Sequence, residues 1–220
     1  RPTWSRLVKE LIETGRIILD LTVITAIAGI IIGLLQLSGL AFNISLLLTE
    51  AADGSLVILL FLTALVCIVL GMGMPSAVIY IVLSVIAAPA LIEAGVGKMS
   101  AHMFLFYFGM LSMITPPVCL ATIAAASVAG TNFWQTGWAG VRLGFVAYIV
   151  PFLFVFYPEL VFEGSAGAII AVMVKSTVGV IILCYCVAGF LYDRLGWPER
   201  GVLGVCGLAV LAAPYDTAVG

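Results

Sequence analysis

Charged residues are scarce in this chain of 220 residues: they make up 9% of it, whereas hydrophobic residues make up 64%. Soluble domains usually contain about 25% charged residues. A surface this apolar would aggregate in water, but a lipid bilayer would solvate it. The net charge is only −2 and the sequence has no basic patch, so no nucleic-acid partner is expected. The composition therefore predicts a membrane protein.

The residue patterns of common enzyme sites are also missing. The one histidine, His102, begins an apolar segment, where a position at the membrane boundary is favoured over a proton relay. The sequence has no Ser/His/Asp arrangement and no metal-spaced cluster, and the glycines at 71–75 lack the βαβ context of a dinucleotide site. We therefore expect neither enzyme activity nor an organic cofactor.

The cysteines give no sign of a disulfide framework. There are five of them, all within apolar stretches, and an odd number without paired loop positions argues against disulfides. Packing roles are expected instead, since a free cysteine behaves as a small buried hydrophobe. The five are Cys67, Cys119, Cys184, Cys186 and Cys206.

The amino-terminal segment, residues 1–16, combines basic and apolar side chains. This pattern predicts an amphipathic segment that lies at the membrane interface. The chain begins with Arg1 rather than methionine, and no signal peptide is recognisable, so we expect it to be a piece of a longer protein. Asp20, deep in the next apolar run, is a functional candidate by default. Because it follows Arg16 by one helical turn, an interfacial ion pair is favoured.

Six apolar runs are candidate membrane segments. They are 17–37, 56–91, 102–129, 143–160, 166–192 and the short 202–213. Two of them, 56–91 and 102–129, are interrupted. Each arm of these two would be roughly 20–25 Å long, which is short of a hydrocarbon core of about 30 Å. Each interrupted run is therefore predicted to be either a re-entrant hairpin or a discontinuous span.

The distribution of basic residues limits the topology. Cytoplasmic loops hold most Lys and Arg, so the amino-terminal segment, Arg142 and the loop at 194–200 are expected inside. The loops at 50–53 and 159–163 contain no Lys or Arg and are expected outside. This pattern requires that one interrupted run crosses the membrane and the other returns. It leaves open which run does which.

The first interruption is GMGMP at residues 71–75. Proline lacks an amide donor, so the helix should break there and release polar backbone groups. At bilayer depth such groups persist only inside protein or facing water. Freed carbonyls suit a cation such as sodium, and the amides that begin the next helix suit a carboxylate. A kinked, protein-buried helix without a ligand is the alternative. The predicted site residues are Gly71, Gly73, Met74, Pro75 and Ser76, with Gly71 and Gly73 as sodium ligands.

The second interruption is SMITPP at residues 112–117. Its oxygen donors are the hydroxyls of Ser112 and Thr115 and the carbonyls that precede Pro116. Ser112, Thr115 and Pro116 are therefore predicted site residues, with the first two as sodium ligands. Packing between helices is the alternative role for such hydroxyls. Paired interruptions are the sequence sign of an ion or substrate site in a secondary transporter.

Three stretches resemble a known family. They are GMGMPSAVIYIVLSVIAAPALIEAGV, AHMFLFYFGMLSMITPPVCLATIAAASVAG and the GW…RLG…VPFLFVFYPEL region. Together they resemble the carboxy-terminal half of the large membrane subunit of tripartite ATP-independent periplasmic (TRAP) transporters. The greatest likeness is to the fused permeases that work with TAXI-type binding proteins. Residues 15–160 carry the resemblance, and 163–220 resemble the looser extension of the fused type.

The resemblance implies an all-α polytopic membrane protein that forms one half of an inverted-repeat transporter. Its regions would be an interfacial segment at 1–16, a second-repeat transport region at 17–160 and a transmembrane extension at 161–220. The run at 56–91 would be the re-entrant hairpin, and 102–130 the discontinuous helix. The first repeat and the small-subunit helices are missing, so this chain would hold half of a site. Met113 supplies no carboxylate where an acid would help to hold a cation.

The function implied by the resemblance is sodium-coupled uptake of small organic anions such as carboxylates, in the bacterial inner (cytoplasmic) membrane. The expected partners are a periplasmic TAXI-type substrate-binding protein, the remaining permease half, the small-subunit helices and the lipid bilayer. Sodium would be the coupling ion. The competing interpretation is a structural or scaffolding membrane subunit without a ligand site of its own.

Overall fold

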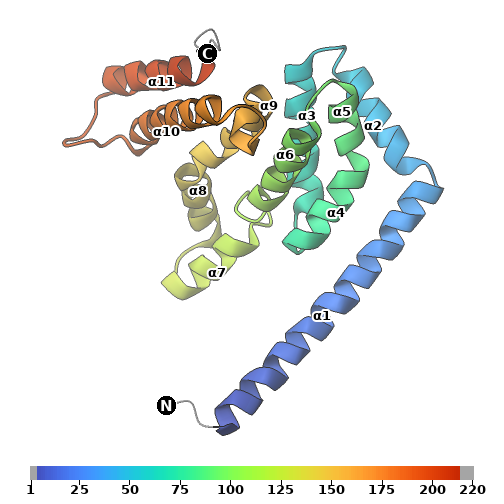
Figure 1. Ribbon diagram of the computed structural model, residues 1–220. Coiled ribbons are helices and arrows are strands. Elements are labelled where there is room, and N and C mark those ends of the chain that lie inside the picture. Colours follow the sequence, from blue (N-terminus) through green and yellow to red (C-terminus); the bar gives the residue numbers. More distant parts are fainter. Residues whose placement is uncertain (1–3, 214–220) are drawn as a thin grey trace.

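The computed structural model describes residues 4–213, and this part of the chain is all-α, without a named strand (Figure 1). The predicted all-α fold class is confirmed. The helices are α1 (Trp4–Leu37), α2 (Leu40–Ala51), α3 (Leu56–Gly71), α4 (Ser76–Ile86), α5 (Ala88–Glu93), α6 (Lys98–Leu111), α7 (Leu120–Ala129), α8 (Phe133–Leu143), η1 (Phe145–Tyr148), α9 (Val150–Phe156), η2 (Pro158–Val161), α10 (Ala166–Ala188) and α11 (Trp197–Ala212).

Helix α1 is a single long helix that extends away from the other elements (Figure 1). It runs without a break through the predicted boundary between the interfacial segment and the first apolar run. Only its carboxy-terminal part packs against the body, where Ala28 is buried with Ala41 of α2 and Val78 of α4. The side chain of Asp20 is outside the described ones, so its pairing with Arg16 stays a prediction.

The core of the molecule lies around α6, which packs against α3, α4 and α9. Phe104 of α6 is completely buried, and its ring meets the ring of Phe152 edge-on at 5.4 Å. Gly109 allows α4 to approach closely, because a Cβ added there would lie 2.6 Å from Cγ2 of Ile79. Close packing of this kind fixes the ends of α3, α4 and α6 relative to one another.

Helices α10 and α11 form a closely packed pair (Figure 1). A Cβ on Gly179 would lie 2.6 Å from Leu211, so the two backbones approach through small residues. Arg200 of α11 donates to the carbonyls of Cys186 and Val187 at the end of α10. Basic side chains at helix carboxy-termini satisfy the last carbonyls and oppose the helix dipole.

Lys175 of α10 caps the carboxy-terminal end of α11 in the same way. Its ammonium group donates to the carbonyl of Ala213, which directly follows α11, and to the hydroxyl of Tyr157 at 3.0 Å. It also lies 4.1 Å from the centre of the Tyr157 ring. Each helix of the pair is thus capped at its carboxy-terminal end by a basic side chain of the other.

Few of the described helices are long enough to cross a bilayer alone. By length and apolar composition α10 qualifies, and two bent pairs raise the number of candidate spans to three if each pair is one span. These pairs are Thr22–Leu37 with Leu40–Ala51, bent by 68°, and Phe133–Leu143 with Phe145–Phe156, bent by 64°. The apolar run predicted at 143–160 is therefore not one helix. Pro151 and Pro158 begin new short helices there, since proline fits a first helical turn and disrupts a helix interior.

Candidate functional site

The first interruption separates α3 from α4, as the sequence predicted. Helix α3 ends at Gly71 and α4 begins at Ser76, and the chain reverses its direction between them (Figure 1). Gly73 has a φ of +79°, a left-handed conformation that glycine adopts without steric cost. No described donor forms a hydrogen bond with the carbonyl oxygens of Leu70, Met72 and Gly73. The break therefore presents three backbone acceptors without a partner among the described residues.

The second interruption separates α6 from α7, again where the sequence predicted a break. Helix α6 ends at Leu111 and α7 begins at Leu120, and the chain continues in the same general direction (Figure 1). The amide of Ala121 donates to the carbonyl of Met113 at 3.1 Å and bridges the break. Among the described residues, none donates to the carbonyls of Ile114 and Thr115, nor to that of Pro116.

The two breaks meet in space. A Cβ built on Gly71 would lie 2.6 Å from Oγ of Ser112, and one on Gly73 would lie 4.0 Å from Val118. Ser112 is 1% exposed, and its hydroxyl donates to the carbonyl of Gly109 at 2.6 Å. Its oxygen lone pairs remain beside the end of α3. Two interruptions that are distant in sequence thus form one region of backbone groups that no helix uses.

The other predicted residues of the second break face a different neighbour. The hydroxyl of Thr115 lies 2.6 Å from that of Tyr148 in η1. The ring of Pro116 would lie 3.3 Å from a Cβ on Gly137 of α8. The predicted residues therefore divide into two groups. Ser112 joins Gly71 and the hairpin, whereas Thr115 and Pro116 join the α8–η1 segment.

Three predicted residues lie at the start of α4. Met74 and Pro75 are partly buried, and Ser76 is exposed. Pro75 is the N-cap residue, with φ −62° and ψ 145°, so the α4 helix starts directly after it. The first amides of a helix have no partners within that helix and carry a partial positive charge. This end of α4 can therefore accept an anionic group.

The electrostatics of the region come from the backbone. Residues 70–76 and 111–120 contain no charged side chain. The carboxy-terminal ends of α3 and α6 contribute partial negative charge, and the amino-terminal ends of α4 and α7 contribute partial positive charge. Among the side chains that the structure describes, no group of three His, Cys, Asp or Glu residues is placed to hold a metal. Carbonyl and hydroxyl oxygens, which suit hard cations, are the ligands that the region offers.

The sequence analysis did not identify two residues that make notable contacts in the structure. Tyr148 contacts Thr115 although it lies in a different apolar run, and no sequence signal connects the two. Lys175 had a clear signal, because it is a single basic residue inside the long apolar run at 166–192.

His102 is partly buried, and its Nδ1 lies 3.1 Å from the hydroxyl of Tyr80. The His102–Tyr80 pair connects α6 to α4.

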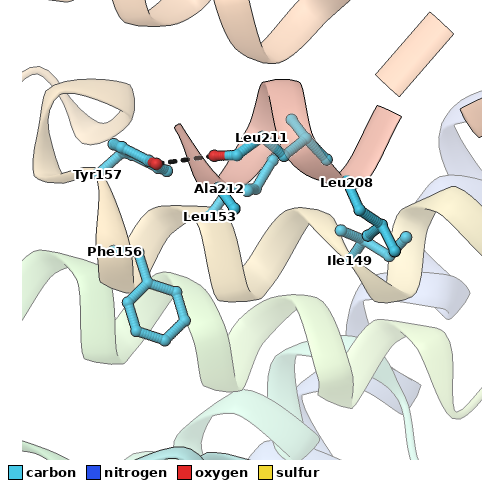
Figure 2. A pocket seen from close by; sticks show the side chains of 7 residues that line it. All are labelled: Ile149, Leu153, Phe156, Tyr157, Leu208, Leu211 and Ala212. Atoms are coloured by element: carbon cyan, nitrogen blue, oxygen red, sulfur yellow. Dashed lines mark hydrogen bonds between the residues drawn. The ribbon is translucent and has the colours of Figure 1, made fainter. Parts of the chain in front are cut away.

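A cavity of about 660 Å³ lies outside this region, between α9 and α11 (Figure 2). Its lining is almost entirely apolar, and the hydroxyl of Tyr157 donates to the carbonyl of Leu211 at 2.7 Å instead of standing free. No residue of either break contributes to it. The lining residues are Ile149, Leu153, Phe156, Tyr157, Leu208, Leu211 and Ala212.

An apolar all-α chain with two interrupted helices, whose ends meet at an uncharged site of backbone dipoles, has the architecture of a membrane transport protein. The family model described as "Tripartite ATP-independent periplasmic transporter, DctM component" matches residues 1–188, and the chain belongs to this family. It is thus a permease component of a TRAP transporter, as its resemblance implied. The match ends with α10 and does not include α11. No curated protein and no solved structure matches the chain.

Proposed function

We propose that this chain forms one half of the transport site in a sodium-coupled permease for small organic anions such as carboxylates. The observation that carries the proposal is the contact between the two breaks at Gly71 and Ser112. This contact brings free carbonyl oxygens and helix amino-termini into one region, without charged side chains. A site of this composition fits a cation and an anion that bind together.

Sodium would be held by oxygen atoms of both breaks. The carbonyls of Gly71 and Gly73 would contribute from the hairpin, where that of Gly73 has no described donor and that of Gly71 accepts from the Met74 amide at 3.5 Å. The hydroxyls of Ser112 and Thr115 would contribute from the second break. A sodium ion needs several oxygen ligands to replace its hydration shell. The breaks supply such ligands because their backbone groups are not used by a helix. The chain's own oxygens thus fit the coupling ion.

The anion would bind near the start of α4, at Met74, Pro75 and Ser76. The partial positive charge of the helix end would attract a carboxylate. A sodium ion a short distance away would add a full positive charge, so each solute would raise the affinity for the other. This mutual dependence is what couples uptake of an anion to a sodium gradient.

The other components would complete the transporter in the bacterial inner membrane. We propose that a periplasmic TAXI-type binding protein delivers the anion, and that the remaining permease half and the small-subunit helices surround this chain. The exposed apolar surface of α7 supports such an assembly, since Val128 is 92% exposed. Small residues along α7 would let another helix or the bilayer pack closely against it.

The proposal is tested by thermal unfolding of the purified complete permease in sodium chloride and in choline chloride of equal ionic strength. A ligand that binds only the folded protein stabilises it by about 2.7 kcal/mol at a hundredfold excess over its Kd. We expect the melting temperature to rise with sodium and to saturate. Identical melting temperatures in both salts would overturn the proposal and favour a scaffolding subunit.

A further inference from the structure

The hydroxyl of Thr115 has two partners in the structure. It lies 2.6 Å from the carbonyl oxygen of Leu111 and 2.6 Å from the hydroxyl of Tyr148. Leu111 is the last residue of α6, and Tyr148 is the last residue of η1. The threonine thus connects the end of the broken helix to a segment beyond α8.

The direction of these hydrogen bonds follows from the chemistry of the groups. A carbonyl oxygen only accepts, so Thr115 must donate its single hydroxyl hydrogen to Leu111. The hydroxyl hydrogen in the second bond must then come from Tyr148. This donation occupies one of the two lone pairs on Oγ1 of Thr115. The other lone pair remains available, and its direction is set by the two bonds.

We propose that Tyr148 is a positioning residue of the sodium site, which orients the hydroxyl of Thr115 so that its remaining lone pair faces the ion. This inference rests on the proposed function. A cation requires a hydroxyl whose hydrogen points away from it, and the bond to Leu111 keeps the hydrogen away. Tyr148 helps to hold the oxygen in this orientation, because losing its hydroxyl would leave the bond to Leu111 as the one remaining hydrogen bond of the Thr115 side chain among the described residues.

The position of Tyr148 is itself fixed by packing against the break. A Cβ on Gly144, which directly precedes η1, would lie 2.9 Å from Ile114. A Cβ on Gly140 would lie 2.7 Å from Thr122 of α7. Tyr148 and Ile114 both pack against the main core cluster. The α8–η1 segment therefore touches both sides of the second break, and Tyr148 is its hydrogen-bonding contact with Thr115.

The test is a sodium titration of thermal unfolding for the complete permease carrying Tyr148→Phe. A typical hydrogen bond changes an equilibrium constant about three- to tenfold, so the sodium midpoint should rise by about that factor. The melting temperature in choline chloride should fall by no more than the loss of one hydrogen bond explains. Tyr80→Phe is the matched control, since it removes the hydroxyl that pairs with His102 and should leave the sodium midpoint unchanged.

Two threonine backgrounds distinguish positioning from packing. If Tyr148 acts through the hydroxyl of Thr115, the effect of Tyr148→Phe should persist in the Thr115→Ser background and disappear in the Thr115→Val background. A lower melting temperature without sodium, combined with an unchanged midpoint, would assign Tyr148 to packing and overturn the inference. An effect of equal size in both backgrounds would also overturn it.

The inference and the proposed function fail in different ways. If the wild-type permease shows no response to sodium, the proposed function fails, and the inference fails with it. If the wild type responds to sodium and Tyr148→Phe has the wild-type midpoint, only the role of Tyr148 is overturned.

Discussion

Gly71 and Ser112 are in such close contact that a methyl group on the glycine would lie 2.6 Å from the serine hydroxyl oxygen and 2.9 Å from its Cβ. The two residues come from different interrupted helices. Since Ser112 is buried and its hydroxyl is bound to the Gly109 carbonyl, it has little room to move. The absence of a side chain at Gly71 is therefore what allows the two breaks to meet.

Replacing Gly71 by alanine should separate the breaks. Overpacking of a buried contact usually costs about 1–3 kcal/mol, so we expect Gly71→Ala to lower the melting temperature of the permease and to weaken its response to sodium. Gly29→Ala is the control, because a Cβ at Gly29 in α1 would meet nothing within 4 Å. Equal stability and equal sodium response of the two variants would contradict the contact.

The close contact between α4 and α6 leads to a similar prediction, in which a second substitution should restore part of the lost stability. Gly109→Ala should destabilise the permease by about 1–3 kcal/mol, because its Cβ would lie 2.6 Å from Cγ2 of Ile79. Removing that methyl group with Ile79→Ala should recover part of the loss in the double variant. Unfolding midpoints of the two single variants and the double variant measure this coupling. Strictly additive losses would mean that the two residues do not touch.

The lysine in α10 should hold the end of α11 in place. Lys175→Met would remove the donor to the Ala213 carbonyl and to Tyr157. We expect amide hydrogen exchange in the last turn of α11 to become faster by about tenfold, the change that corresponds to losing a hydrogen bond from a charged group. Lys98→Met, at an exposed position in α6, is the control and should leave this exchange unchanged. Unchanged exchange in Lys175→Met would show that the cap is not needed.

The positions of the two breaks could be predicted from the sequence, because proline and glycine act on the local backbone. Pro75 and Pro116 each lack an amide donor and disturb a helix interior through the local backbone. The membrane class followed from composition and from the long apolar runs, and the all-α fold was implied by the family resemblance. These predictions need no tertiary information.

The grouping of the site residues could not be predicted, since it depends on how the helices pack. Ser112 and Thr115 are close in sequence, yet one faces the hairpin and the other faces Tyr148. The apolar residues of the run at 143–160 predict one candidate segment, but Pro151 and Pro158 begin separate short helices within it. The placement of these segments in a bilayer, including the re-entrant depth of the hairpin, stays a prediction.

Equilibrium binding of ²²Na⁺ to the purified complete permease tests the central claim most directly. The account predicts saturable binding by the wild type. It also predicts a loss of affinity of about tenfold in Thr115→Val, which keeps the shape of the side chain and removes its oxygen. Sodium binding of wild-type affinity in both Thr115→Val and Ser112→Ala would contradict the claim that the two breaks form the ion site.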